Sequence, residues 1–120
     1  MRAVLILFLA TSFRVLAGGH VSSADVLRFT ADAIPPQADQ HFATFTVNRA
    51  ELGKILDTYH EVSAEVWTHH YSHVHGGDRT GTIILKDGQR LNWLVRPGGL
   101  ATLKAEDGVT HYLVRELPKA

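Results

Sequence analysis

The chain has no cysteine among its 120 residues. This absence excludes a disulfide scaffold, a thiolate metal site, thiol catalysis and a lipid-bearing cysteine. The protein must therefore hold its fold together through a hydrophobic core alone, which a domain of roughly a hundred residues can do.

An excess of charge of either sign is also missing. Lysine and arginine together number 12, aspartate and glutamate together number 12, and the basic residues form no run. Nucleic acids and anionic membranes attract proteins through basic surfaces, so neither is an expected partner. The apolar content of 45% and the charged content of 20% are ordinary for one globular domain.

The chain lacks a hydrophobic run long enough to cross a bilayer, which needs roughly 20 residues. Its longest apolar run is Ala3–Ala10, which follows the positively charged Arg2. Small or short residues then stand at positions 15 and 17, the −3 and −1 positions of a cut before Gly18, and this order of charge, apolar run and small residues is typical of a signal peptide. We therefore predict a signal peptide over residues 1–17, with a later candidate cut after Ala24.

The alternative interpretation of this segment is a buried first strand of a cytosolic protein. The signal-peptide order favours export, so we expect a periplasmic or secreted protein with no membrane span after processing. Removal of residues 1–17 takes away Arg2 and Arg14 and leaves 10 basic against 12 acidic residues. Residues 25–117 are then expected to form a single α+β domain.

The clearest helix signal lies between residues 48 and 60. Asn48 and Glu51 have the spacing of a capping box. Apolar residues then recur at i, i+3, i+4 and i+7, on one helical face: Leu52, Ile55, Leu56 and Tyr59. The pattern predicts a helix from Arg49 to about His60, in which Gly53 costs about 1 kcal/mol relative to alanine.

Strands are predicted over residues 25–34, 42–47 and 62–74, which are rich in β-branched and aromatic residues. The last third of the chain holds Asp87-Gly88 and Asp107-Gly108, each between two apolar runs. Such pairs indicate hairpins with two-residue type I′ turns, and residues 80–115 are thus expected to form a four-stranded meander.

The predicted register follows from these two-residue turns, which place Ile84 opposite Leu91 and Leu103 opposite Tyr112. The predicted fold class is α+β, with one helix packed on a mainly antiparallel, meander-type sheet of about five or more strands.

The segment THHYSHVHGGD, residues 68–78, gathers four of the chain's eight histidines. Alternate residues of a strand point to the same side. One face of the predicted strand over 62–74 and its continuation therefore carries aromatic and imidazole side chains together: Trp67, His69, Tyr71, His73 and His75. A helix is the alternative here, and it would place His69 and His73 one turn apart.

Imidazole nitrogens bind zinc, copper and nickel. The candidate metal ligands are His69, His73 and His75, with Asp78 adding a carboxylate. A strong site needs three or four converging ligands, and the other histidines are distant in the sequence, so we expect weak binding and no required cofactor. Two further interpretations are a pH-responsive patch and a solvent-facing row at the rim of a sheet.

No catalytic pattern such as HExxH or GxSxG occurs in the sequence. We therefore expect a small exported, non-enzymatic binding protein of inhibitor or immunity type, acting on another exported or envelope protein. Aromatic residues are enriched at protein interfaces, so the predicted partner-binding face is the one that carries Trp67, His69, Tyr71, His73 and His75. The alternative is a periplasmic protein that binds a transition metal through the histidines of residues 69–75.

Overall fold

A computed structural model describes residues 21–34, 44–71 and 77–118 of the chain. These ranges contain six strands: β1 Val26–Ala31, β2 His60–Val62, β3 Arg79–Leu85, β4 Arg90–Arg96, β5 Leu100–Ala105 and β6 Thr110–Val114. They also contain three helical segments: the 3₁₀ turn η1 Ser23–Asp25 and the α-helices α2 Arg49–Thr58 and α3 Ala64–His70. The predicted signal peptide, residues 1–17, lies outside the described residues.

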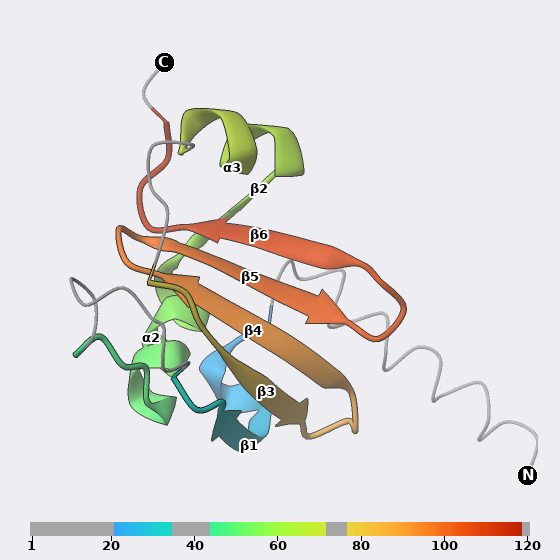
Figure 1. Ribbon diagram of the computed structural model, residues 1–120. Helices are drawn as coiled ribbons and strands as arrows, with labels where there is room; N and C mark the ends of the chain where they lie inside the picture. Colours follow the sequence, from blue (N-terminus) through green and yellow to red (C-terminus); the bar gives the residue numbers. More distant parts are fainter. Residues whose placement is uncertain (1–20, 35–43, 72–76, 119–120) are drawn as a thin grey trace, which may run out of the picture.

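The strands form one antiparallel sheet in the order β1-β3-β4-β5-β6-β2 (Figure 1). β3 to β6 are the predicted four-stranded meander. β1 joins the β3 side of this meander and β2 joins the β6 side, so both edges of the sheet come from the earlier part of the chain. The predicted α+β class with a mainly antiparallel sheet is confirmed.

Both Asp-Gly turns occur, but each pairs its strands one position away from the predicted register. Ile83 rather than Ile84 lies opposite Leu91, and the β5–β6 pair is shifted in the same way. A type I′ turn needs positive φ at both central residues. Among the described residues only glycines have positive φ, with 95° at Gly88. The loop 86–88 is therefore a three-residue turn that ends in glycine, which moves the register by one.

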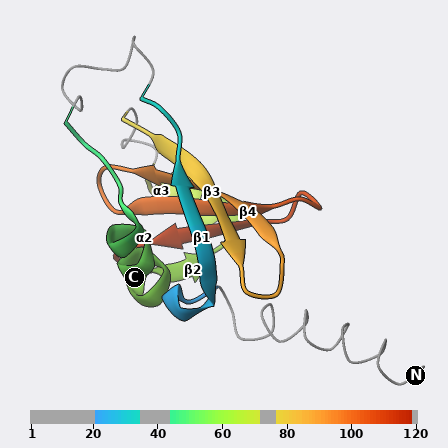
Figure 2. The same cartoon turned by 90° about the horizontal axis from the view of Figure 1, so that it is seen from below.

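Helix α2 forms where the sequence predicts it. The Asn48 side chain accepts a hydrogen bond from the Glu51 backbone N–H at 2.7 Å, and the Glu51 carboxylate accepts one from the Asn48 N–H at 2.9 Å. These reciprocal bonds satisfy donors that a helix start leaves unpaired. η1 lies beside α2 (Figure 2).

The hydrophobic core lies between α2 and one face of the sheet. The helix contributes Leu52, Ile55 and Leu56. Alternate residues of the strands supply most of the rest of the main cluster, among them Ile83, Leu85, Leu91, Trp93, Val95, Leu103 and Leu113. Because the strands alternate, the residues between these point to the opposite face of the sheet.

The predicted strand over residues 62–74 is wrong in its described part. β2 ends at Val62, and residues 64–70 form the helix α3, which is the alternative weighed for this segment. The Ser63 hydroxyl caps the helix by accepting a hydrogen bond from the Val66 N–H at 3.1 Å. The Val, Trp and Thr content of the segment favours a strand locally, so the cap and tertiary contacts override that propensity.

The predicted strand over residues 42–47 is also wrong where the structure describes it, because residues 44–47 belong to no strand. Val47 is buried in the core, so its apolar character reflects packing rather than strand pairing. The Phe45 carbonyl accepts a hydrogen bond from Arg79 Nε at 2.7 Å, and the same guanidinium lies 5.7 Å from the Phe45 ring centroid. The Phe45 carbonyl thus has an arginine side chain as its hydrogen-bond donor, where a strand residue would have the backbone N–H of a neighbouring strand.

Candidate functional site

Two aromatic residues of the predicted partner-binding face fasten α3 to the sheet. Trp67 Nε1 donates a hydrogen bond to the Leu113 carbonyl at 3.3 Å, and its ring centroid lies 5.5 Å from that of Tyr112. The Tyr71 hydroxyl donates to the Glu116 carbonyl. Both side chains are partly buried. Trp67 and Tyr71 are therefore structural residues of this corner of the fold.

Because residues 64–70 form a helix, the residues of the predicted partner-binding face do not all point to the same side. Successive helical residues are about 100° apart, so Trp67 and Tyr71 share a side of α3 while His69 points about 200° away from Trp67. His69 is exposed at the end of the helix. The expectation that these three residues share one face is wrong, because it depended on the period of a strand. His73 and His75 lie outside the described residues.

Asp78, the predicted carboxylate ligand, is bound to Arg96. Its Oδ1 lies 2.7 Å from Arg96 Nε and its Oδ2 lies 3.0 Å from Nη2, a two-point ion pair. The hydrogen bonds that Arg96 donates to the Asp78 carboxylate raise the pKa of Arg96, against the opposing effect of burial. The same guanidinium lies 5.3 Å from the Trp67 ring centroid. A metal ion at Asp78 would have to displace Arg96.

The described ranges contain no group of three or more His, Asp or Glu side chains placed to hold a metal ion. They do contain a histidine–carboxylate pair, in which His111 Nδ1 of β6 lies 2.7 Å from Glu61 Oε2 of β2. Such a pair orients the imidazole ring, as in a catalytic triad. Within the described part of the chain, however, no hydroxyl group is bonded to His111, and the pair links the short edge strand β2 to β6.

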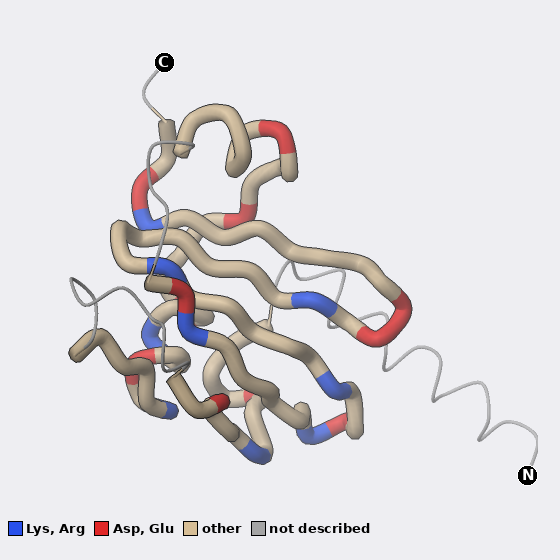
Figure 3. Tube along the Cα trace, in the orientation of Figure 1, with Lys and Arg blue, Asp and Glu red and all other residues tan. Residues whose placement is uncertain are grey.

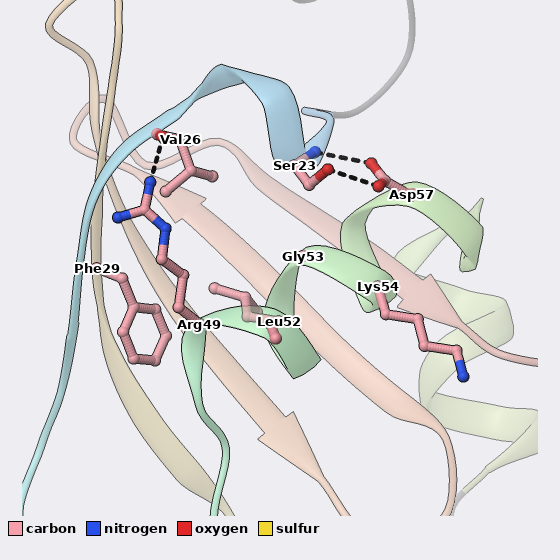
Figure 4. Close-up of a pocket in the computed structure, with 9 residues that line it drawn as sticks. Ser23, Val26, Phe29, Arg49, Leu52, Gly53, Lys54 and Asp57 are labelled. Atoms are coloured by element: carbon pink, nitrogen blue, oxygen red, sulfur yellow. Dashed lines mark hydrogen bonds between the residues drawn. The ribbon is translucent and has the colours of Figure 1, made fainter.

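A cavity of about 500 Å³ lies between η1, β1 and α2 (Figure 4). Several of its polar groups are hydrogen-bonded: the Ser23 N–H and hydroxyl donate to the Asp57 carboxylate at 2.7 and 2.6 Å. Arg49 Nη2 donates to the Val26 carbonyl at 2.7 Å. A Cβ on Gly53 would lie 3.1 Å from Ser23 Cβ, which explains a glycine inside α2. The bonds between Ser23 and Asp57 hold η1 against α2.

A second cavity, of about 470 Å³, lies at the opposite side of α2. We call it the α2 groove; it is bounded by α2, residues 45–47, the turn 97–99 between β4 and β5, and Arg115. Its apolar lining includes Phe45, Val47, Ile55, Tyr59 and Val95. Burial raises the pKa of Tyr59 above its ordinary value of 10.0, and the nearby charge of Arg115 offsets part of this rise.

No pattern in the sequence predicts the α2 groove. Its walls come from separate segments of the chain, and Gly98-Gly99, in the turn that borders it, carries only a turn signal in the sequence. No periodicity or motif joins these segments, so only the folded arrangement reveals the groove.

Within the described ranges, no element covers the face of the sheet opposite the core over β4 and β5 (Figure 1), and α3 lies at one corner of this face. One row of paired residues crosses five strands on this side, and a second, partial row runs beside it. We call this surface the open face; its members are Thr30, Thr82, Asn92, Lys104 and Thr110 in the first row and Thr80, Leu94, Thr102 and Tyr112 in the second, with Tyr112 packed against Trp67 of α3. All of them are exposed or partly exposed.

The chain matches no protein-family model, no curated protein and no solved structure. No helix within the described ranges is long and apolar enough to cross a membrane.

Proposed function

We propose that the chain is a small exported, non-enzymatic protein that binds a partner protein through the open face. The supporting observation is the composition of this surface, in which Lys104 is the one charged residue and hydroxyl and amide groups surround Leu94. Solvated protein surfaces are commonly rich in charged residues, whereas interface centres are depleted of them. In its low content of charged residues, the open face resembles an interface centre.

The border of the open face indicates the charge of the partner. Arg28 and Arg90 lie on either side of Ile84 in the next row of the sheet, and both are exposed. Together with Lys104 they give this part of the face a positive character, while acidic positions lie in the turn that joins β5 and β6 (Figure 3). We therefore expect a partner with an acidic surface, since complementary charges steer association.

Contacts near residue 21 bear on the proposed export. Val21 is only 5% exposed and belongs to the core cluster, and Ser23 makes two hydrogen bonds to Asp57. A cut after Ala24 would remove these residues from the folded domain, whereas a cut before Gly18 keeps them. We propose cleavage at the earlier site. Mass spectrometry of the native protein should find Gly18 at its start, and an intact Met1 would contradict export.

The partner-binding proposal can be tested with two lysine variants that carry the same change of charge. Lys104→Glu alters the open face, and Lys86→Glu alters an exposed residue of the β3–β4 turn. Tagged forms of both variants and of the wild type are used to capture proteins from a cell-envelope extract, and the affinity for the captured protein is then measured at two salt concentrations.

We expect Lys104→Glu to weaken binding by about tenfold or more, and Lys86→Glu to leave it nearly unchanged. Higher salt should weaken the wild-type complex. A partner that binds wild type and Lys104→Glu equally well would contradict a role for the open face.

A further inference from the structure

We propose that the α2 groove is a binding site for a medium-chain carboxylate, whose hydrocarbon tail lies in the groove and whose carboxylate is bound by Arg115. This inference is independent of the partner proposed for the open face, because the two sites lie on opposite sides of the sheet.

The size and lining of the groove suit such a tail. A volume of about 470 Å³ lies within the usual range for small-molecule sites of about 300–1,000 Å³. Carbon-rich side chains supply much of the lining, including Phe45, Val47, Ile55 and Val95. Val47, Ile55 and Val95 are buried members of the core cluster, so the inner wall of the groove is held in place by the fold.

Positively charged side chains outnumber negatively charged ones in the lining of the groove. The carboxylate of Glu51 is used in the capping box of α2, and the guanidinium of Arg96 is paired with Asp78. For the side chains of Lys54 and Arg115, the described parts of the chain provide no hydrogen-bond or ion-pair partner. The Glu51 carboxylate keeps its negative charge, because the donor that it binds is a neutral N–H. With Arg96 offset by Asp78, the charges of Glu51, Lys54 and Arg115 give the groove a net charge of +1 beside an apolar surface, which is complementary to an amphipathic anion.

Arg115 is held at the groove by Gly99. The Gly99 carbonyl accepts a hydrogen bond from the Arg115 N–H at 2.8 Å. A Cβ on Gly99 would lie 3.1 Å from Arg115 Nε and 3.2 Å from Cζ, so the guanidinium lies against the bare Cα of the glycine. Gly99 also has φ of 91°, a conformation that glycine adopts readily. Glycine at this position therefore fixes both the turn and the place of the arginine.

The donors at this end of the groove favour a carboxylate. A planar guanidinium matches the two oxygens of a carboxylate with two parallel hydrogen bonds. Tyr59 lines the same groove, and because burial raises its pKa the hydroxyl stays protonated and is available as a further donor. The arrangement supplies an anion site at the rim and an apolar site below it.

Decanoate and decanol test the proposal, because they share an apolar tail and differ in the charged head. Each is titrated below its aggregation concentration into the full folded protein at pH 7, with calorimetry as the readout. The variants are Arg115→Gln, which removes the anion site, and Thr58→Trp, which fills the groove from an exposed position of α2. Arg90→Gln is the matched control, since Arg90 is an exposed arginine away from the groove.

We expect wild type and Arg90→Gln to bind decanoate equally and more tightly than decanol. Arg115→Gln should weaken decanoate binding by about tenfold or more and change decanol binding by less than about twofold. Thr58→Trp should weaken both. No decanoate binding by the wild type, equal loss of both ligands in Arg115→Gln, or full binding in Thr58→Trp would each overturn the proposal. Circular dichroism of each variant shows whether it is folded.

Discussion

Gly81 lies directly against the indole ring of Trp93. A Cβ on Gly81 would lie 2.5 Å from Trp93 Cζ2 and 2.1 Å from the Thr30 carbonyl oxygen. The missing side chain lets the indole cross β3, where its Nε1 donates a hydrogen bond to that carbonyl at 3.1 Å and its ring stacks on Phe29. The largest buried side chain thus ties β4 to β1, although β3 lies between them.

Gly81→Ala should therefore destabilise the protein severely, by about 3 kcal/mol or more, because neither a backbone carbonyl nor a packed indole can give way cheaply. Chemical denaturation followed by tryptophan fluorescence measures the loss. Gly108→Ala is the comparison variant: a Cβ on Gly108 meets nothing within 4 Å, so this change carries only the backbone strain of a φ of 94° and no steric clash. If Gly81→Ala lowers the free energy of unfolding no more than Gly108→Ala does, the close contact of Gly81 with Trp93 and the Thr30 carbonyl is contradicted.

The two turn glycines give a second prediction, which depends on backbone conformation alone. Gly88 and Gly108 have φ of 95° and 94°, and a Cβ on either would meet open space. Valine resists positive φ, so Gly88→Val and Gly108→Val should each lower the free energy of unfolding by about 1–3 kcal/mol. Unchanged denaturation midpoints in both variants would contradict the positive φ at these positions.

The class of the fold and its helix α2 could be predicted from the sequence because their signals are local. The capping residues Asn48 and Glu51 and an apolar stripe specify α2, and each Asp-Gly pair specifies a chain reversal. The register could not be settled in this way. An Asp-Gly pair occurs both in two-residue turns and at the end of three-residue turns, and these alternatives differ by one residue in pairing.

The corner around α3 could not be predicted because its determinants are distant in the sequence. α3 has only seven residues, and an isolated helix of that length is unstable. Its anchor Trp67 bonds to the Leu113 carbonyl, 46 positions away. The sequence identified Trp67 and Tyr71 as notable residues, but a surface role and a packing role for an aromatic residue look alike until its neighbours are known.

The ion pair between Asp78 and Arg96 gives a third prediction. Its side chains are 32% and 21% exposed, so solvent screens part of the attraction. Asp78→Asn and Arg96→Gln, combined in a double-mutant cycle, should give a coupling free energy of about 0.5–2 kcal/mol. Thermal denaturation in low and high salt measures it. A coupling near zero would leave Asp78 available as the metal ligand predicted from the sequence.

Tyr59 gives a prediction about alkaline pH. Its pKa is raised in the folded protein by burial, with Arg115 acting in the opposite direction. A raised pKa means that the folded state holds the phenol proton more tightly than the unfolded state. The resulting stabilisation is complete below the ordinary value of 10.0 and is lost as the pH rises through the folded-state pKa. Tyr59→Phe should therefore lose less stability than wild type between pH 9 and pH 11, as measured by urea denaturation.

The last prediction concerns the histidines of residues 69–75. His69 is exposed on α3, Asp78 is paired with Arg96, and no ready-made group of three ligands occurs in the described ranges. We therefore expect zinc to bind with a dissociation constant in the micromolar range or weaker, equivalent to a binding free energy of no more than about −8 kcal/mol. The double variant His69→Ala/His73→Ala should weaken binding further and leave the circular dichroism spectrum unchanged, because His69 is exposed on α3. His60→Ala, which removes an exposed histidine from β2, is the matched control. A nanomolar, stoichiometric zinc or copper site that the double variant abolishes and the control retains would make metal binding, rather than partner binding, the function of this protein.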